Sequence, residues 1–237
     1  MVPISEFRCI KVKIDKSNGG IISPSVMCAD LLNLEHDISE LKQLGVNLLH
    51  VDFMDNRFVP NITFGTDIVR KLKNICSMVR DIHIMGYDPE QYFDLMDIGE
   101  NDMVSVHFEE CDDVDAVLKE IRARGSLSSL AISPDTPVEE IENHLDNIDA
   151  VLLMSVYPGF AGKPMAPGSF ERLKKVRNII DNSGHDILLE VDGNVSWKNA
   201  PIMRECGADM FVAGSSSIFG KDGSLEDNIK RFRELIK

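Results

Sequence analysis

The sequence predicts an α/β protein with a (β/α)8 TIM barrel and an N-terminal extension. From residue 21 onward, short apolar runs alternate with amphipathic segments at intervals of about 25 to 30 residues, which is typical of a parallel sheet covered by helices. Eight such units can be counted, and eight parallel strands close a barrel. The chain has 237 residues, 43% of them hydrophobic, which suits one large core and leaves no room for a second full domain.

The expected elements follow from local patterns. The eight expected strands are residues 21–23, 48–54, 79–85, 103–107, 130–133, 150–155, 187–192 and 210–214. A helix is expected over residues 31–44, where Leu34, Ile38 and Leu41 form one apolar stripe. Two further helix starts place a capping residue before a proline, at Asp88 and at Thr136, and the second also matches a capping box.

Domain boundaries follow from the turn signal Ser17-Asn18-Gly19-Gly20. We predict an extension or linker over residues 1–20 and the barrel over residues 21–237. The extension could cover a barrel end or a subunit interface, or it could lack order.

Charge and cysteine content narrow the function classes. The net charge of −14 argues against nucleic acid or an anionic membrane as partner. No segment approaches the roughly 20 apolar residues of a membrane span, and no signal peptide is evident. The five cysteines are scattered and odd in number, so we expect reduced thiols. These features predict a soluble cytoplasmic protein.

The chemistry-bearing residues collect at the ends of expected strands. In residues 48–54, His50 and Asp52 lie on a face that a buried strand would fill with apolar groups, and such groups are costly to bury without a strong partner. His83 and Asp192 occupy similar positions, and catalytic groups of such barrels sit at the C-terminal ends of strands. Two imidazoles and two carboxylates suit zinc, iron(II), manganese or cobalt. Alternatively, the histidines are satisfied core residues and the aspartates are strand-end caps.

The remaining histidines divide into two groups. His107 also lies near the C-terminal end of a strand, whereas His36, His144 and His185 are expected at the solvated surface.

Three methionines and three glycine turns are also expected at the C-terminal opening of the barrel, which is called the barrel mouth below. Met54, Met85 and Met154 can form a soft apolar rim there, although methionine is more often a gap filler in a core. Glycine turns let backbone N–H groups approach an oxyanion, and the last strands of such barrels often bind phosphate in this way. The turn residues predicted to hold phosphate are Gly159, Phe160, Ala161, Gly162, Gly193, Asn194, Gly214 and Ser215. Alternatively, each turn needs glycine for its geometry alone.

From about residue 21 to the C-terminus, the sequence resembles the ribulose-phosphate 3-epimerase family. The matching motifs are Ser23-Pro24-Ser25, His50-Val51-Asp52-Phe53-Met54-Asp55, Phe58-Val59-Pro60-Asn61, His83-Ile84-Met85, Ser105-Val106-His107, Met154-Ser155, Pro158-Gly159-Phe160, Val191-Asp192-Gly193 and Ala213-Gly214-Ser215. The resemblance implies a TIM barrel of the ribulose-phosphate-binding type.

The resemblance also assigns roles. It implies that His50, Asp52, His83 and Asp192 bind one divalent metal, for which zinc is our first expectation. Asp52 and Asp192 would be the paired acid and base, and the methionines would line the intermediate. The glycine turns would hold the phosphate, and Ser25 and His107 would lie near the substrate.

The implied reaction interconverts D-ribulose 5-phosphate and D-xylulose 5-phosphate. Inverting C3 requires removal of a proton next to a carbonyl, and a metal would stabilise the resulting enediolate. The expected ligand is a phosphorylated ketose. We also expect a homo-oligomer, either a dimer or a hexamer.

Several residues depart from the family pattern, and we expect them to lie near the part of the sugar far from the reacting carbon. Asn56-Arg57, Asn194 and Phe160-Ala161-Gly162-Lys163 replace the usual residues. Met27-Cys28, Ala161 and Asn194 resemble the D-allulose 6-phosphate 3-epimerase branch, so a six-carbon substrate is the alternative. Asn194 is expected to adopt a positive φ, which Asn tolerates. Lys163 could add charge near the phosphate or be solvated.

Two other functions fit the sequence less well. Phosphate-binding decarboxylase barrels use an Asp-x-Lys-x-x-Asp array, which this sequence lacks. A sugar-phosphate sensor would be expected to lose at least one of the two proton-transfer carboxylates, and both are present.

Overall fold

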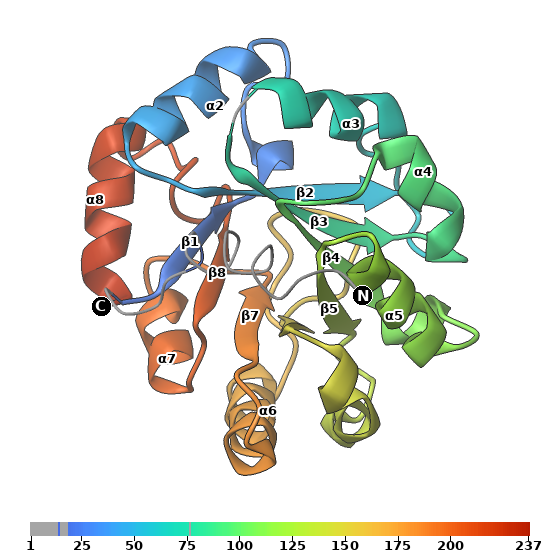
Figure 1. Ribbon diagram of the computed structural model, residues 1–237. Helices are drawn as coiled ribbons and strands as arrows, with labels where there is room; N and C mark the ends of the chain where they lie inside the picture. The colour runs from blue at the N-terminus through green and yellow to red at the C-terminus, as the bar shows by residue number, and fades with distance from the viewer. Residues whose placement is uncertain (1–13, 15–18, 76) are drawn as a thin grey trace.

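Eight parallel strands form a barrel with helices around its outside (Figure 1). The computed structural model describes residue 14, residues 19–75 and residues 77–237. The strands are β1 (Ile21–Pro24), β2 (Leu48–Met54), β3 (Val79–Met85), β4 (Asp102–His107), β5 (Leu127–Ile132), β6 (Ala150–Met154), β7 (Leu188–Asp192) and β8 (Met210–Ala213). Hydrogen-bonded neighbours run β1-β8-β7-β6-β5-β4-β3-β2, and an isolated parallel bridge between Ser25 and His50 joins β1 to β2. The predicted (β/α)8 barrel is therefore confirmed.

Strand positions agree closely with the sequence patterns, with one clear exception. β2 and β3 have the predicted bounds, but β5 begins at Leu127 instead of residue 130. Two serines follow Leu127 and interrupted the apolar pattern. Ser128 is buried, and its hydroxyl donates to the carbonyl of Asn147 at 2.6 Å. A buried strand can carry a serine where such a bond satisfies the hydroxyl.

Helices surround the barrel. The α-helices are α2 (Leu34–Gln43), α3 (Thr66–Ile75), α4 (Phe93–Met96), α5 (Val114–Ala123), α6 (Ser169–Ser183), α7 (Asn199–Glu205) and α8 (Leu225–Leu235), and the 3-10 helices are η1 (Val26–Cys28), η2 (Pro89–Tyr92), η3 (Phe108–Glu110) and η4 (Val138–Asn147). The expected start of the first long helix at residue 31 is wrong, because α2 begins at Leu34. Ile38 and Leu41 are buried as predicted, whereas Leu32 is 99% exposed.

Of the two predicted proline-linked helix starts, the one at Asp88 is confirmed in position and the one at Thr136 lies one residue too early, and neither residue makes a side-chain cap. The Thr136 hydroxyl donates to the Glu109 carboxylate rather than to a helix end, and η4 begins at Val138 without a side-chain cap. Asp88 is the N-cap residue of η2 and Pro89 is the first residue of the helix, as predicted, but Asp88 has φ of 50° and its side chain caps no N–H group. In both cases the local pattern marks the start of a helix, but a competing contact or an unusual backbone conformation keeps the side chain from bonding to the helix end.

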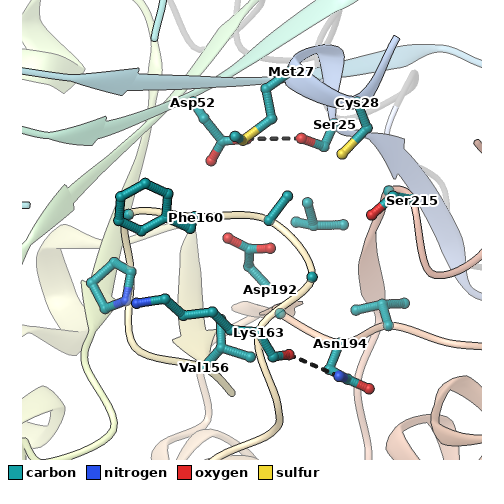
Figure 2. A pocket seen from close by; sticks show the side chains of 18 of the residues that line it. Ser25, Met27, Cys28, Asp52, Val156, Phe160, Lys163, Asp192, Asn194 and Ser215 are labelled. Carbon is teal, nitrogen blue, oxygen red and sulfur yellow. Dashed lines mark hydrogen bonds between the residues drawn. The ribbon is translucent and has the colours of Figure 1, made fainter. Parts of the chain in front are cut away.

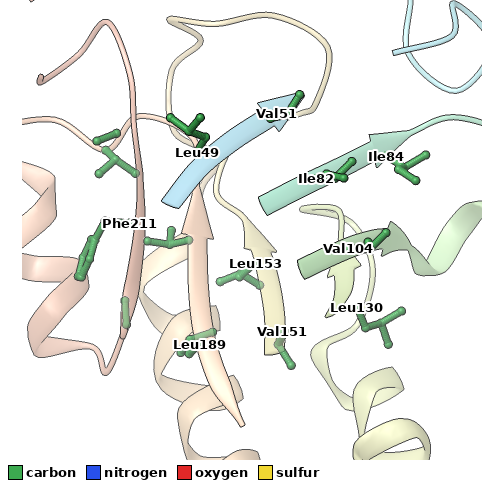
Figure 3. Close-up of a cluster of buried hydrophobic side chains, with 14 of the residues drawn as sticks. Leu49, Val51, Ile82, Ile84, Val104, Leu130, Val151, Leu153, Leu189 and Phe211 are labelled. Carbon is green, nitrogen blue, oxygen red and sulfur yellow. The ribbon is translucent and has the colours of Figure 1, made fainter. Parts of the chain in front are cut away.

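Two apolar layers hold the barrel. On the outside, strand residues such as Val51, Ile82, Val104, Leu153 and Phe211 face the helices (Figure 3). These side chains are fully buried. A long-range apolar core of this kind is the main stabilising contribution in a barrel.

A second apolar cluster lies inside the barrel at the N-terminal ends of the strands. It contains Ile21, Leu48, Val79 and their counterparts on the other strands, together with Ile14. Ile14 is 7% exposed, so one residue of the predicted extension packs against this barrel end. Residues 1–13 and 15–18 lie outside the described residues, and the division into residues 1–20 and 21–237 stays a prediction.

Two chain-wide expectations are met within the described residues. No helix there is long and apolar enough to cross a membrane. Cys28, Cys111 and Cys206 are free thiols, as predicted, while Cys9 and Cys76 lie outside the described part.

Candidate active site at the C-terminal barrel mouth

A pocket opens at the C-terminal ends of the strands (Figure 2). Most of the residues that the sequence singled out line it: Ser25, Asp52, Met54, Met85, Met154, Gly159, Phe160, Ala161, Gly162, Asp192, Gly193, Asn194, Gly214 and Ser215. His50, His83 and His107 do not line it, because their rings are fully buried beneath it. One cavity therefore brings together the predicted acid–base pair, the methionines and the glycine turns.

Four side chains from three strands converge at the base of this pocket. His50 and Asp52 come from β2, His83 from β3 and Asp192 from β7. One ligand atom of each lies within 4.8 Å of those of all the others. His50 Nε2 and His83 Nδ1 are each 3.3 Å from Asp52 Oδ1, and His83 Nδ1 is 3.8 Å from Asp192 Oδ2. The spacing is compact enough for one cation to be shared.

The His50 ring supports the same conclusion. Its Nδ1 is bonded to Asp81 Oδ2 at 2.7 Å, whereas its Nε2 is buried without a hydrogen-bond partner. A buried nitrogen that lies 3.3 Å from the Asp52 carboxylate without forming a hydrogen bond is costly, and a cation that takes its lone pair would offset this cost. Two nitrogens and two carboxylate oxygens form a donor set that suits a borderline divalent metal. The four residues therefore fit a metal ion.

The carboxylates beneath His50 were missed in the sequence. Asp81 accepts from the Ser23 hydroxyl at 2.7 Å, and Glu190 Oε1 lies 3.8 Å from His50 Nδ1. Burial, followed by the negative charge of Asp81, raises the pKa of Glu190 well above its usual value. The nearby His50 outweighs the effect of burial and lowers the pKa of Asp81. The sequence did contain a sign of these partners, because Asp81 and Glu190 are acidic residues inside predicted buried strands.

His83 is held from its other side by a second histidine. His83 Nε2 is 2.9 Å from His107 Nε2, and His107 Nδ1 is 3.0 Å from Glu109 Oε2. Burial lowers the pKa of His107 to about 4. Burial alone would raise the pKa of Glu109, but hydrogen bonds, chiefly from His107, lower it to about 2. Glu109 lies two residues beyond the strand and was not predicted.

The two pocket aspartates have different surroundings. The Ser25 hydroxyl donates to Asp52 Oδ2 at 2.8 Å, a bond drawn in Figure 2. Burial would raise the pKa of Asp52, but the neighbouring His50 and His83 lower it below its usual value. Burial and the negative charge of Asp52 raise the pKa of Asp192 to about 6. Carboxyl groups whose pKa values are pushed apart are suited to acid and base roles.

The turns that follow β6, β7 and β8 form another part of the pocket lining. Gly159, Gly162 and Gly193 have positive φ, and Asn194 has φ of 47°, which confirms its predicted left-handed conformation. The Asn194 side-chain amide donates to the Lys163 carbonyl at 2.8 Å (Figure 2). This bond connects the turn after β7 to the loop after β6, so the two turns are held in a fixed relation.

The surface histidines are partly as expected. His36 is well exposed, and His185 is half exposed and lies near Asp146. His144 was wrongly placed among the solvated residues. Its side chain is only 15% exposed, and its Nδ1 lies 2.7 Å from Asp115 Oδ1. The position is polar by helical periodicity, but the neighbouring helix α5 covers it.

Gly193→Ala should disrupt this site. A Cβ at Gly193 would lie 2.5 Å from Val156 Cγ2 and 2.9 Å from the Val156 backbone nitrogen, at φ of +104°. We expect this variant to be destabilised by about 2 kcal/mol more than Gly184→Ala. Gly184 is the matched control, since it has φ of +75° and a Cβ added there would meet no atom within 4 Å. Urea unfolding measures both, and equal losses would contradict the steric argument.

Comparisons with known proteins give a consistent result. The family model described as the ribulose-phosphate 3 epimerase family matches residues 21–219. A ribulose-phosphate 3-epimerase from Serratia marcescens is 38% identical over 203 residues, which cover 85% of this chain and 96% of that relative. One from Bacillus subtilis is 35% identical over 201 residues, covering 84% and 92%.

A comparison with solved structures supports the barrel fold. A 3-keto-L-gulonate-6-phosphate decarboxylase from Vibrio cholerae superposes with a TM-score of 0.64 at 13% identity, covering 92% of this chain and 97% of that one. At this identity the likeness concerns the barrel architecture alone.

Proposed function

Because the chain belongs to the ribulose-phosphate 3-epimerase family, we propose that it is a metal-dependent epimerase that interconverts D-ribulose 5-phosphate and D-xylulose 5-phosphate. The observation that carries this proposal is the convergence of His50, Asp52, His83 and Asp192 at the base of a pocket walled by glycine turns. The relatives' names favour the five-carbon substrate. No finding favours the six-carbon alternative specifically.

In this proposal, Asp52 and Asp192 transfer the protons. One carboxylate removes the C3 proton from one face of the carbon, and the other delivers a proton to the opposite face. Their origin on different strands, β2 and β7, supports this arrangement. A divalent ion held by His50, Asp52, His83 and Asp192 would supply positive charge beside the developing enediolate. Zinc is our first choice, with iron(II), manganese or cobalt as alternatives.

The rest of the pocket binds and orients the sugar phosphate. Met54, Met85 and Met154 present polarizable, weakly hydrogen-bonding surface beside the reacting carbons. The phosphate is assigned to the turns at Gly159–Gly162, Gly193–Asn194 and Gly214–Ser215, where backbone N–H groups can approach it. Ser25 bonds to Asp52 and so orients that carboxylate. We also propose a homo-oligomer, a dimer or a hexamer, in which the exposed Leu31 and Leu32 would be covered.

The substrate can be tested directly. D-ribulose 5-phosphate and D-allulose 6-phosphate should be compared as substrates, before and after chelator treatment. We expect kcat/KM to favour the pentose phosphate at least about tenfold and turnover to stop on metal removal, because the enediolate charge is then unbalanced. Readdition of Zn²⁺ or Fe²⁺ should restore it. A preference for the hexose phosphate would overturn the substrate assignment, and full activity after verified metal loss would overturn the mechanism.

Lys163 should contribute to phosphate binding. Among the lining residues, all of which belong to the described part of the chain, it is the one Lys or Arg, and its Nζ lies 5.2 Å from the Phe160 ring centroid. Lys163→Gln is expected to raise KM about fivefold with little change in kcat, because a solvent-screened charge contributes about 1 kcal/mol. Steady-state kinetics at two salt concentrations measures this. The control is Lys175→Gln on the outer helix α6, and an equal KM in both variants would contradict the assignment.

A further inference from the structure

A continuous line of contacts leads from the pocket base to a carboxylate that does not reach the pocket. It runs from His83 through His107 to Glu109, with nitrogen–nitrogen and nitrogen–oxygen distances of 2.9 and 3.0 Å. Both histidines are fully buried, and neither His107 nor Glu109 lines the pocket. We propose that Glu109, acting through His107, fixes the ring proton of His83 on Nε2 and so keeps Nδ1 free to bind the metal. This inference rests on the metal site of the proposed function.

The direction of the hydrogen bonds follows from the groups themselves. An ionised carboxylate can only accept, and a neutral imidazole donates through one nitrogen and accepts through the other. Glu109 therefore requires the proton of His107 on Nδ1, which leaves His107 Nε2 as an acceptor. His83 must then donate from Nε2. With the ring proton on Nε2, the lone pair of His83 Nδ1 would face Asp52 and Asp192 at 3.3 and 3.8 Å, which a shared cation makes favourable; without a cation, the contact to Asp52 would instead take a proton on Nδ1.

Glu109 is itself held firmly. Its Oε1 accepts from the Ser133 backbone N–H at 2.9 Å and from the Thr136 hydroxyl, while its Oε2 faces His107. The Arg172 guanidinium donates to the carbonyls of Ser133 and Thr136 at 2.9 and 2.7 Å, which fixes the loop that carries both donors. The carboxylate is thus anchored on one oxygen and directed at His107 with the other.

The other ligand histidine has a shorter version of the same arrangement. His50 Nδ1 bonds to the buried Asp81 at 2.7 Å, and its unpartnered Nε2 points to the metal position. Each ligand histidine is therefore paired with one carboxylate, the buried Asp81 directly for His50 and the partly exposed Glu109 through His107 for His83. Such outer partners orient metal ligands and typically change metal affinity 10- to 100-fold when removed. His107 and Glu109 are accordingly positioning residues rather than substrate contacts.

The replacement of Glu109 by Gln provides a directional test. The Ser133 N–H is a fixed donor, so the amide oxygen of Gln should face Ser133 and the amide NH2 group should face His107 Nδ1. That NH2 group donates, so it would move the His107 proton to Nε2 and the His83 proton to Nδ1. The metal-binding lone pair would then be lost. Glu109→Ala removes the carboxylate without imposing this reversed order.

The experiment measures Zn²⁺ affinity by chelator competition for wild type, Glu109→Gln, Glu109→Ala and the control Glu110→Gln. Glu110 is the adjacent carboxylate, and its change removes the same charge. We expect Glu109→Gln to weaken Zn²⁺ binding about 10- to 100-fold, Glu109→Ala to weaken it less, and Glu110→Gln to stay within twofold of wild type. A purely structural role of Glu109 predicts the opposite order, since Ala leaves the larger void.

A second measurement needs no variant. In the Zn²⁺-loaded wild type, imidazole ¹⁵N shifts should identify His107 as protonated on Nδ1 and His83 as protonated on Nε2. The reverse assignment, or wild-type Zn²⁺ affinity in Glu109→Gln, would overturn the inference. If wild type itself binds no Zn²⁺ at this site, the proposed function fails, which is a distinguishable result.

Discussion

Asp192→Asn is expected to lower kcat by about 10³-fold or more, because asparagine cannot take or give the C3 proton. Asp192 lines the pocket as one member of the four-ligand cluster, and burial together with the negative charge of Asp52 raises its pKa to about 6. Binding of the sugar phosphate should largely survive, since the phosphate is assigned to backbone turns. Steady-state kinetics and the affinity for a non-reacting phosphorylated analogue measure the two effects separately.

The metal must be controlled in this experiment, because Asp192 is also a proposed ligand. Kinetics should therefore be measured at saturating Zn²⁺, with the bound metal quantified. Asp181→Asn on α6, where the carboxylate is 61% exposed and bonded to Arg177, is the matched control and should retain normal turnover. Near-normal rates in metal-saturated Asp192→Asn would contradict the two-carboxylate scheme.

Arg80→Met is expected to destabilise the protein by about 3 to 5 kcal/mol, because it leaves the Asp102 carboxylate buried without its partner. Arg80 lies in β3 on the face toward the helices and is 1% exposed. Its Nε and Nη2 donate to the two oxygens of Asp102 at 2.7 and 2.6 Å. It also donates to the carbonyls of Val69, Met96 and Asp97. Burial raises the pKa of Asp102 even with Arg80 in place.

Urea unfolding measures this loss. Arg70→Met is the control, because Arg70 also pairs with an aspartate but on the surface, with both side chains at least half exposed; a change below about 1 kcal/mol is expected. Replacing both members of the buried pair, Arg80→Met with Asp102→Leu, should cost less than Arg80→Met alone. A loss below about 1 kcal/mol for Arg80→Met would contradict this account.

The sequence predicted the barrel and its mouth because both depend on local, periodic patterns. Strict alternation in β2 placed His50 and Asp52 on the inner face, and the parallel strands brought His83 and Asp192 to the same end. The left-handed conformation of Asn194 followed from its place in a tight turn. The positions of the four site residues need only the direction and face of each strand.

The partners of those residues could not be predicted in the same way. Glu109 contacts Ser133 and Thr136, which lie 24 and 27 residues further along the chain. No local sequence pattern predicts these contacts. Asp81 and Arg80 are adjacent in β3, yet one bonds to the ligand histidine inside the barrel and the other to Asp102 outside it. A charged residue inside a buried strand indicates that it has a partner, but only the three-dimensional structure shows which residue that partner is.

The central claim is that one divalent ion is shared by His50, Asp52, His83 and Asp192. Crystals of the Zn²⁺-loaded protein, measured at the zinc absorption edge, test it most directly. We predict a single anomalous peak about 2.0 to 2.2 Å from His50 Nε2, His83 Nδ1 and one oxygen of each aspartate. A peak at the neighbouring group of His50, Asp81 and Glu190, or no peak at the barrel mouth, would contradict it.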